Sequence, residues 1–285
     1  MDYKERRIHG EEGLPLSMYD QTAQSTRYHM NCHWHPEHEI VYVKSGVLEL
    51  RLGVGDESIL MKKGDVVFVQ GGVLHSAIPT DCHYVCFVLD PSRMLSPEDA
   101  CEVVIKRIEK GKLKVDPLVS DKHPEMTTLC EELYRILVQR EEGFAFFVKS
   151  LILRFFGYLL KFQLYEKNPV SVPTEEKSAG RMKSVLDYIR KNYSKEIELS
   201  ELAALSNMSP NYFCRYFRKL TGQTPIEYLI TYRLESACYA LRNTDLTITD
   251  VAFACGFNDV SHFIKSFRRA YQMTPKAYRA QNGGI

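Results

Sequence analysis

The fold is decided by residues 209–228, SPNYFCRYFRKLTGQTPIEY, because much of this stretch returns fifty residues later, at 259–278, as DVSHFIKSFRRAYQMTPKAY. The matching pairs are Phe213 and Phe263, Arg215 and Lys265, Phe217 and Phe267, Arg218 and Arg268, Thr224-Pro225 and Thr274-Pro275, and Tyr228 and Tyr278. Upstream, Glu201-Leu202-Ala203 matches Asp250-Val251-Ala252 with the offset shortened by one residue. This one-residue difference in spacing falls in a turn, where insertions and deletions are tolerated best. The chain therefore contains two copies of one small unit.

The second copy has the pattern of two short helices joined by a tight turn. Thr247, followed by an acidic residue three positions later, is typical of a capping box before a helix over about 248–255. Gly256 then stands where a helix end commonly needs left-handed backbone. Asp259 is suited to cap the next helix, which the pattern predicts at about 260–270.

The first copy repeats this plan. A supporting helix is predicted at 199–206, and Ser209 is placed to cap a second helix at 210–220. Pro210 fits the first helical position, where its missing N–H costs nothing. A third helix, about 225–241, connects the two copies.

The second helix of each copy has a buried aromatic face and a polar, cationic face. Phe213 and Phe217, like Phe263 and Phe267, recur at a spacing of four and are expected in the core. From residue 178 onward there are fifteen Lys and Arg against nine Asp and Glu, whereas the rest of the chain has 22 against 27. A basic part joined to an acidic part indicates a nucleic-acid-binding module attached to something else.

Residues 233–275 resemble the signature of the AraC/XylS family of bacterial transcription regulators. The residues that carry the resemblance are Arg233-Leu234, Ala237, Ile248, Val251-Ala252, Gly256-Phe257, Phe263, Phe267-Arg268 and Thr274-Pro275. The resemblance covers about 180–279. It implies two helix-turn-helix units that insert their second helices into the major groove of double-stranded operator DNA, with RNA polymerase as a further partner. The DNA-binding residues it implies are Asn211, Cys214, Arg215 and Arg218 in the first unit, and Val260, Ser261, Lys265 and Arg268 in the second.

The N-terminal part resembles the cupin barrels. His33-Trp34-His35, then Glu39 and Gly46, follow the first cupin motif, and 64–75 resembles the second, Gly-x5-Pro-x-Gly-x2-His. Gln70 stands in place of the proline of that motif and Pro79 in place of its terminal asparagine. The surrounding residues alternate as half-buried strands do, with Glu39, Val41 and Val43 predicted on one face and Ile40 and Tyr42 on the other. A small double-stranded barrel over about 16–90 is the expected fold.

The side chains of His33, His35, Glu39 and His75 are the types that a cupin uses to hold a divalent metal. Their imidazoles can equally hydrogen-bond a polar ligand. Regulators of the AraC/XylS family often keep a His-x-His-like sequence in the barrel without a known metal. We expect the four residues to form the effector site with no cofactor, and a divalent metal is the alternative. The effector implied by the resemblance is a sugar or a related polar metabolite.

A helical segment follows the barrel, with candidate helices at 97–108, 125–139 and 144–164. The last has one apolar stripe from Phe144 to Phe162 and a second formed by Phe146, Leu153, Phe156, Leu160 and Leu164. Lys149, Arg154 and Lys161 interrupt the run, which excludes a membrane span. The helix could be buried between its own barrel and other helices, or one stripe could meet the same helix of a second chain. The resemblance to AraC/XylS regulators favours the second arrangement, and a homodimer with Phe156 and Leu160 in the contact is expected.

The expected fold is α+β. Its parts are a cupin-like sensing barrel (1–95), a helical dimerisation segment (96–165), a linker (166–179) and an all-α domain of two helix-turn-helix units (180–285). Residues 1–7 lack the apolar core of a signal peptide, and the eight cysteines show no Cys-x-x-Cys pair, so a cytoplasmic protein associated with the nucleoid is expected. The expected function is a ligand-responsive regulator and not an enzyme. The alternatives are a metal-dependent cupin enzyme with a DNA module, and a regulator whose barrel only dimerises.

Overall fold

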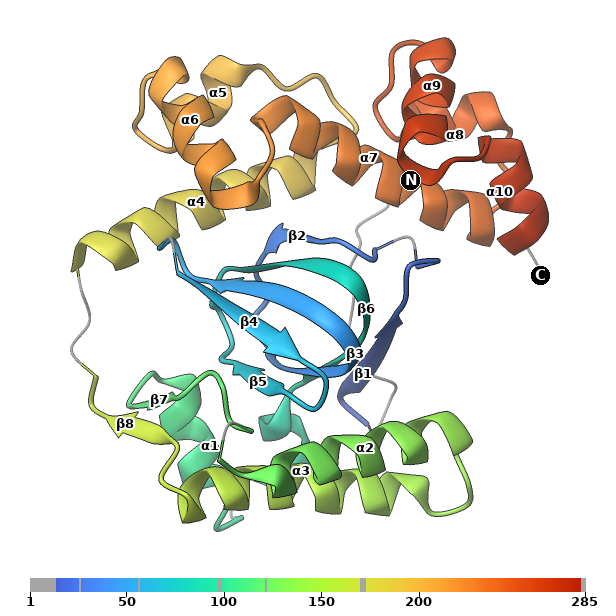
Figure 1. The fold of residues 1–285 in the computed structure, drawn as a ribbon. Helices are drawn as coiled ribbons and strands as arrows, with labels where there is room; N and C mark the ends of the chain where they lie inside the picture. The colour runs from blue at the N-terminus through green and yellow to red at the C-terminus, as the bar shows by residue number, and fades with distance from the viewer. Residues whose placement is uncertain are drawn as a thin grey trace. The chain divides into compact units, whose positions relative to one another are not determined.

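The computed structural model describes residues 14–25, 27–55, 57–96, 99–120, 122–169 and 173–282. The chain divides into two compact units, Met1–Glu175 and Glu176–Ile285. The first holds every strand of the described residues, and the helix-turn-helix copies lie in the second (Figure 1). This is the α+β architecture expected from the sequence. A part in effector sensing is a further expectation from the sequence for the arm before Leu16, which lies outside the described residues up to residue 13.

The first unit is built on an antiparallel six-stranded sheet that curls into a barrel (Figure 1). Its strands are β1 (Leu16–Gln21), β2 (Met30–His33), β3 (His38–Leu52), β4 (Ser58–Lys62), β5 (Val66–Val69) and β6 (His75–Leu89). The two long strands β3 and β6 pair along their whole length, from His38 with Leu89 to Leu52 with His75. Their register shifts beside Gly46, whose φ is +75°. A Cβ at Gly46 would lie 2.1 Å from the carbonyl oxygen of Asp81, so only glycine fits this position of the first cupin motif.

The strand β3 is buried on both faces from His38 to Val43, whereas its alternation had predicted a half-buried strand. Val41 and Val43 belong to the apolar interior of the barrel. Ile40 and Tyr42 belong to a second core between the outside of the sheet and the helices. Both faces are apolar because the barrel is filled on one side and covered on the other.

The covering layer consists of α1 (Glu102–Glu109), α2 (Pro124–Gln139) and α3 (Phe144–Lys161), preceded by a 3-10 turn at Pro91–Met94. A two-stranded sheet of β7 (Leu113–Val115) and β8 (Tyr165–Lys167) completes the unit. The candidate helix at 97–108 is wrong at its start, because turns at Ser96 and Asp99 precede α1. Pro97 and Glu98 themselves lie outside the described residues. Among the described helices, none has the length and apolar character needed to cross a lipid bilayer.

Helix α3 corrects the assignment of its second stripe. Phe156 was expected among the residues that meet a second chain, but it is buried and its ring lies 5.9 Å from that of Phe68 on β5. Helical geometry explains the difference, since Phe156 follows Ile152 by four residues and Phe155 by one, on the edge of the buried face. Phe146, Leu153 and Leu160 remain exposed, at 82%, 36% and 36% of their surface.

The expected linker, 166–179, is partly structured. β8 covers its beginning, and α4 (Pro173–Asn192) already starts at Pro173. Proline is favourable at a first helical position, which explains why the helix begins within a segment whose prolines had indicated a linker. Residues 170–172 lie outside the described part of the chain.

The C-terminal compact unit contains α4, α5 (Leu199–Leu205), α6 (Pro210–Thr221), α7 (Pro225–Asn243), α8 (Ile248–Ala254), α9 (Val260–Tyr271) and α10 (Pro275–Asn282). Figure 1 shows α7 running from the α5–α6 pair to the α8–α9 pair. Thr247 accepts a hydrogen bond from the amide of Asp250 and Asp259 one from Ser261, as capping predicts. Ser209 stands at the N-cap of α6 but its side chain makes no capping bond. All four repeated phenylalanines are completely buried.

Candidate functional site

The barrel brings together the four residues that the cupin-like motifs predict. His33 ends β2, His35 follows it, Glu39 lies on β3 and His75 begins β6. One ligand atom from each of the four lies within 4.8 Å of all the others. Glu39 and His75 are buried, and His33 and His35 are half-buried. Glu39 shares its face of β3 with Val41 and Val43, so the cluster is part of the barrel interior.

Backbone carbonyls orient all three imidazoles. The Nδ1–H groups of His33, His35 and His75 donate to the carbonyl oxygens of Asn31 (2.8 Å), Glu37 (3.0 Å) and Val73 (2.9 Å). A carbonyl oxygen has no proton to give, so the proton of each neutral ring stands on Nδ1. The other nitrogen, Nε2, then presents a lone pair, which is the form in which histidine binds a metal.

Glu39 lies between two of these nitrogens. Its Oε2 is 3.1 Å from Nε2 of His35 and 3.1 Å from Nε2 of His75. A carboxylate oxygen and an unprotonated Nε2 are both acceptors, so each contact requires either a second proton on the imidazole or a cation between the atoms. Protonating both rings would place two positive charges side by side in a buried site, with ring centroids 5.1 Å apart.

The pKa values of the cluster reflect burial and these contacts. Burial, reinforced by the neighbouring His75 and His35, lowers the pKa of His33 well below its ordinary value. Burial acts to raise the pKa of Glu39, but the hydrogen bonds and charges of His35 and His75 outweigh it and hold that pKa well below the usual range. Burial acts to lower the pKa of His35, but the hydrogen bond and charge of Glu39 raise it on balance. A neutral His33 and an ionised Glu39 are the protonation states that bind a cation.

The structure explains one of the two departures from the second cupin motif, Gln70, and locates the other, Pro79. Gln70 uses its amide to hold the segment after α1: its Oε1 accepts from the N–H of Val115 and its Nε2 donates to the carbonyl of Leu113, both at 3.2 Å. A proline at this position could make neither bond. Pro79 lies within β6, is buried and pairs with Leu48.

The predicted DNA-binding residues lie on the outer faces of α6 and α9. In α6, Asn211, Arg215 and Arg218 are exposed and Cys214 is half-buried. In α9, Ser261, Lys265 and Arg268 are exposed, whereas Val260 is half-buried and packs against the core. Sequence reasoning missed Ile264, which is 37% exposed on the same side of α9 as Val260. The fifty-residue repeat aligns Ile264 with Cys214, and this is the signal that could have identified it.

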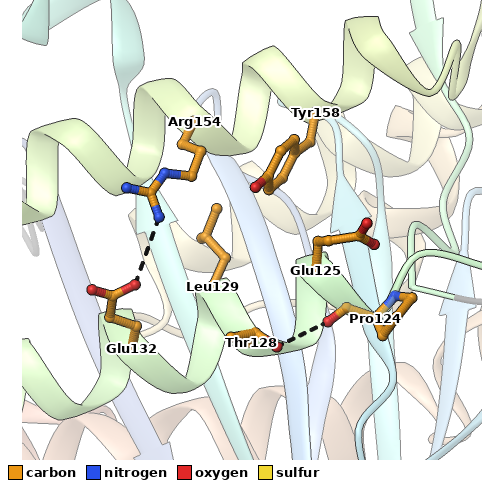
Figure 2. Close-up of a pocket in the computed structure, with 7 residues that line it drawn as sticks. All are labelled: Pro124, Glu125, Thr128, Leu129, Glu132, Arg154 and Tyr158. Carbon is orange, nitrogen blue, oxygen red and sulfur yellow. Dashed lines mark hydrogen bonds and ion pairs between the residues drawn. The ribbon is translucent and has the colours of Figure 1, made fainter.

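A separate surface pocket lies between α2 and α3 and has a volume of about 340 Å³. Figure 2 shows its lining, which consists of Pro124, Glu125, Thr128, Leu129, Glu132, Arg154 and Tyr158. Arg154 and Glu132 face each other across it at 3.8 Å. This pair is exposed to solvent, and the pocket contains no residue of the four-residue cluster or of the α6 and α9 surfaces.

Comparison with known proteins identifies both parts of the chain. Residues 202–281 match the family described as a helix-turn-helix domain, and residues 24–88 match the cupin domain. The uncharacterized HTH-type transcriptional regulator YdeC of Bacillus subtilis (strain 168) is 26% identical over 303 residues, which cover 98% of this chain and 96% of YdeC. The chain is a transcription regulator with an AraC-type helix-turn-helix domain. Its helix-turn-helix units bind DNA, and its cupin barrel is part of a regulator rather than of an enzyme, as the sequence predicts.

Two further similarities are more local or more remote. The HTH-type transcriptional activator RhaS of Yersinia pestis (strain Pestoides F) is 36% identical over 102 residues, which are 36% of this chain and 37% of RhaS. The crystal structure of ToxT from Vibrio cholerae O395 covers 96% of this chain and 100% of its own, at 12% identity and a TM-score of 0.48.

Proposed function

We propose that the barrel is the effector-sensing part of this regulator and that His33, His35, Glu39 and His75 are its ligand site. What supports the proposal is the convergence of three imidazoles and a carboxylate inside an otherwise apolar barrel. Buried polar groups of this kind are costly unless they are satisfied by a ligand or by one another. A polyhydroxylated or anionic effector, such as a sugar or a related polar metabolite, suits these donors and acceptors.

We further propose that a divalent transition-metal ion occupies the cluster, in place of the metal-free site expected from the sequence. The observation that favours the metal is that Oε2 of Glu39 lies 3.1 Å from Nε2 of both His35 and His75, two contacts that each need a second ring proton or a cation between the atoms. Three Nε2 atoms and a carboxylate form a donor set suited to iron, nickel, copper or zinc. A bound ion would supply a positive charge and an open coordination position for an anionic or hydroxylated effector.

Elemental analysis of protein purified without chelator tests this proposal. We expect about one transition-metal ion per chain, because the four ligands form a single site. The ion should be removed by a chelator and restored by titration with the same metal. Metal content well below one tenth of an ion per chain, unchanged after incubation with zinc or iron, would contradict the metal proposal. The imidazoles would then bind the effector directly.

A chain of contacts connects the loop beside the cluster to β8. Gly72 donates to the carbonyl of His35, and the neighbouring Gln70 holds β7 through Leu113 and Val115. β7 pairs with β8, the last strand before α4. If the loop beside the cluster shifts when a ligand binds, β8, the strand that precedes α4, should move with it. Ligand binding would then favour one conformation of the regulator over another.

Arg215 is proposed to read a base in the first half-site. It is exposed on α6, and arginine can pair bidentately with guanine, a contact worth roughly 1–3 kcal/mol of discrimination. Arg215→Ala should weaken binding to the operator by that amount and weaken binding to scrambled DNA much less. Lys219→Ala, a change on the flank of the same helix, should weaken both by similar factors, as loss of a phosphate contact does. Equal weakening on both DNAs by Arg215→Ala would assign Arg215 to a phosphate.

We propose that the regulator is a homodimer that uses an exposed stripe of α3, formed by Phe146, Ser150, Leu153, Gly157 and Leu160. All five are exposed, and the three large side chains recur every seven residues. This spacing returns to nearly the same side of a helix, as in paired helices, and the small residues between them allow a second helix to approach. RNA polymerase remains a proposed partner for regulation at the promoter.

Charged substitutions in this stripe should give a folded monomer. Leu153→Lys with Leu160→Lys should disrupt dimerisation without touching the core, since both side chains are partly exposed. Sedimentation equilibrium measures the change, and operator affinity should fall with it. Val103→Lys is the matched control, because Val103 is exposed on α1, outside the stripe. An unchanged dimer in the double variant would place the interface on another surface.

A further inference from the structure

We propose that Arg233, together with Gly256, sets the orientation of the second helix-turn-helix unit relative to the first. Arg233 would then be a positioning residue for DNA recognition, although it lies on the connecting helix and not on α6 or α9. The proposal rests on the junction where the turn after α4, the middle of α7 and the turn between α8 and α9 meet.

The Arg233 side chain joins three segments at this junction. Its Nε donates to the carbonyl oxygen of Tyr193 and its terminal NH2 group to that of Lys195, both at 2.7 Å. These two carbonyls belong to the turn that follows α4 and leads into the first unit. The guanidinium carbon also lies 5.9 Å from the ring centroid of Phe257, which is buried in the second unit. One side chain on α7 therefore joins the turn that precedes the first helix-turn-helix unit to the second helix-turn-helix unit.

Gly256 brings the backbones of the two turns together. Its φ is +85°, and a Cβ added there would lie 2.4 Å from the carbonyl oxygen of Tyr193 and 2.9 Å from Cα of Ser194. The same Cβ would lie 3.0 Å from Nε of Arg233. Glycine is therefore required both for the left-handed backbone and for the close approach. The second unit rests directly on the turn that Arg233 holds.

A connecting helix does not by itself fix this orientation. Helices of this length bend gently, and a small bend at the middle of α7 changes the direction of everything beyond it. The junction lies beside the midpoint of α7 and opposes such a bend. The planar guanidinium can satisfy two carbonyls in one fixed geometry, whereas the ammonium of lysine is a compact charge without that fork.

The chain provides a matched control in Arg279. Its Nε donates to the carbonyl of Leu241 (3.2 Å) and its NH2 group to that of Leu246 (2.6 Å). This is also a guanidinium bound to two carbonyls, but α10, the end of α7 and the following turn all belong to the second helix-turn-helix unit. Loss of Arg279 should therefore destabilise that unit without changing its orientation relative to the first.

The test measures how strongly binding depends on the spacing of the two half-sites. The probe is a DNA duplex selected from a random library by the full-length wild-type chain, together with versions that have one or two base pairs inserted between the half-sites. Each inserted base pair turns the second half-site by about 35° around the DNA axis. The wild-type chain should bind the inserted duplexes much more weakly than the selected one.

For Arg233→Lys, we expect affinity for the selected duplex to fall about tenfold, as loss of well-formed hydrogen bonds to a charged group predicts. Affinity for the inserted duplexes should hardly change, so the discrimination between spacings shrinks by the same factor. Gly256→Ala, which forces the two turns apart, should act in the same direction. Arg279→Lys should weaken binding to every duplex equally and preserve the discrimination.

Circular dichroism of each variant establishes that the helices are retained. Should Gly256→Ala fail to fold, Arg233→Lys still decides the question. Undiminished discrimination between spacings in Arg233→Lys would overturn the proposal. Loss of discrimination in Arg279→Lys to the same extent would do so as well, because it would show that general destabilisation produces the effect.

Discussion

Replacing Ser236 by proline is expected to abolish the joint binding of the two helix-turn-helix units. Ser236 lies inside α7, which runs from Pro225 to Asn243. Proline removes one hydrogen bond of the helix and its ring collides with the preceding turn, at a cost of about 3 kcal/mol or more. The N-terminal half of α7 packs on α6 through Tyr228 and Phe217, with ring centroids 5.5 Å apart, while Leu234 to Leu241 pack in the second unit. A kink between them changes the angle between the units.

The measurement is a footprint on the selected operator. Two recognition helices about 34 Å apart should protect roughly two turns of DNA from one face in the wild type. Ser236→Pro should protect one turn, with much weaker affinity. Ser236→Ala is the control, since alanine favours a helix and should leave the footprint intact. A full-length footprint with wild-type affinity in the proline variant would show that α7 is not the rigid spacer between the half-sites.

The second large effect is expected for His75→Ala in the barrel. The change removes one Nε2 ligand from the four-residue cluster and one of the two partners of the Glu39 carboxylate. A divalent ion should then bind at least about 100-fold more weakly, since even indirect supports of metal ligands contribute 10- to 100-fold. Elemental analysis should find the ion lost, and operator binding without effector should survive because the DNA-binding unit is unchanged.

His83→Ala is the matched control for this variant. His83 lies on the same strand β6 but faces Asp20 at the surface, outside the cluster. It should retain its metal. An ion still present at one per chain in His75→Ala would remove His75 from the ligand set. Where no ion is found in the wild type, the His35→Ala, His75→Ala double variant tests the metal-free version. Full response to the effector in that variant would exclude the cluster from sensing.

Some of this protein could be predicted from its sequence because the decisive interactions are local or repeated. The copy at 259–278 of residues 209–228 predicted both helix-turn-helix units, and capping residues such as Thr247 and Asp259 set helix starts within one or two residues. The alternation along β3 predicted which side chains share a face, and the structure shows that one face fills the barrel and the other meets the helices. The candidate residues His33, His35, Glu39 and His75 were predicted from the resemblance to the cupin motifs, and the structure brings the four side chains together.

Other features depended on contacts between segments far apart in the chain. Whether Phe156 faces a second chain or the barrel could not be read from its stripe, because the neighbouring Phe68 comes from a strand 88 residues away. The carbonyls that orient the three histidines belong to backbone, which has no sequence signal, and only the folded barrel places Glu39 between two Nε2 atoms.

Arg233 and Gly256 could be recognised as motif residues from the sequence, but their roles in the fold depend on contacts with distant segments. The sequence by itself determined that there are two DNA-binding units, their helices and the faces that carry cations, since periodicity and capping act over a few residues. Only the tertiary structure decided which groups satisfy the Arg233 guanidinium and what meets Gly256. Tyr193 and Lys195 lie about forty residues away, and chain folding, not local pattern, brings them to 2.7 Å.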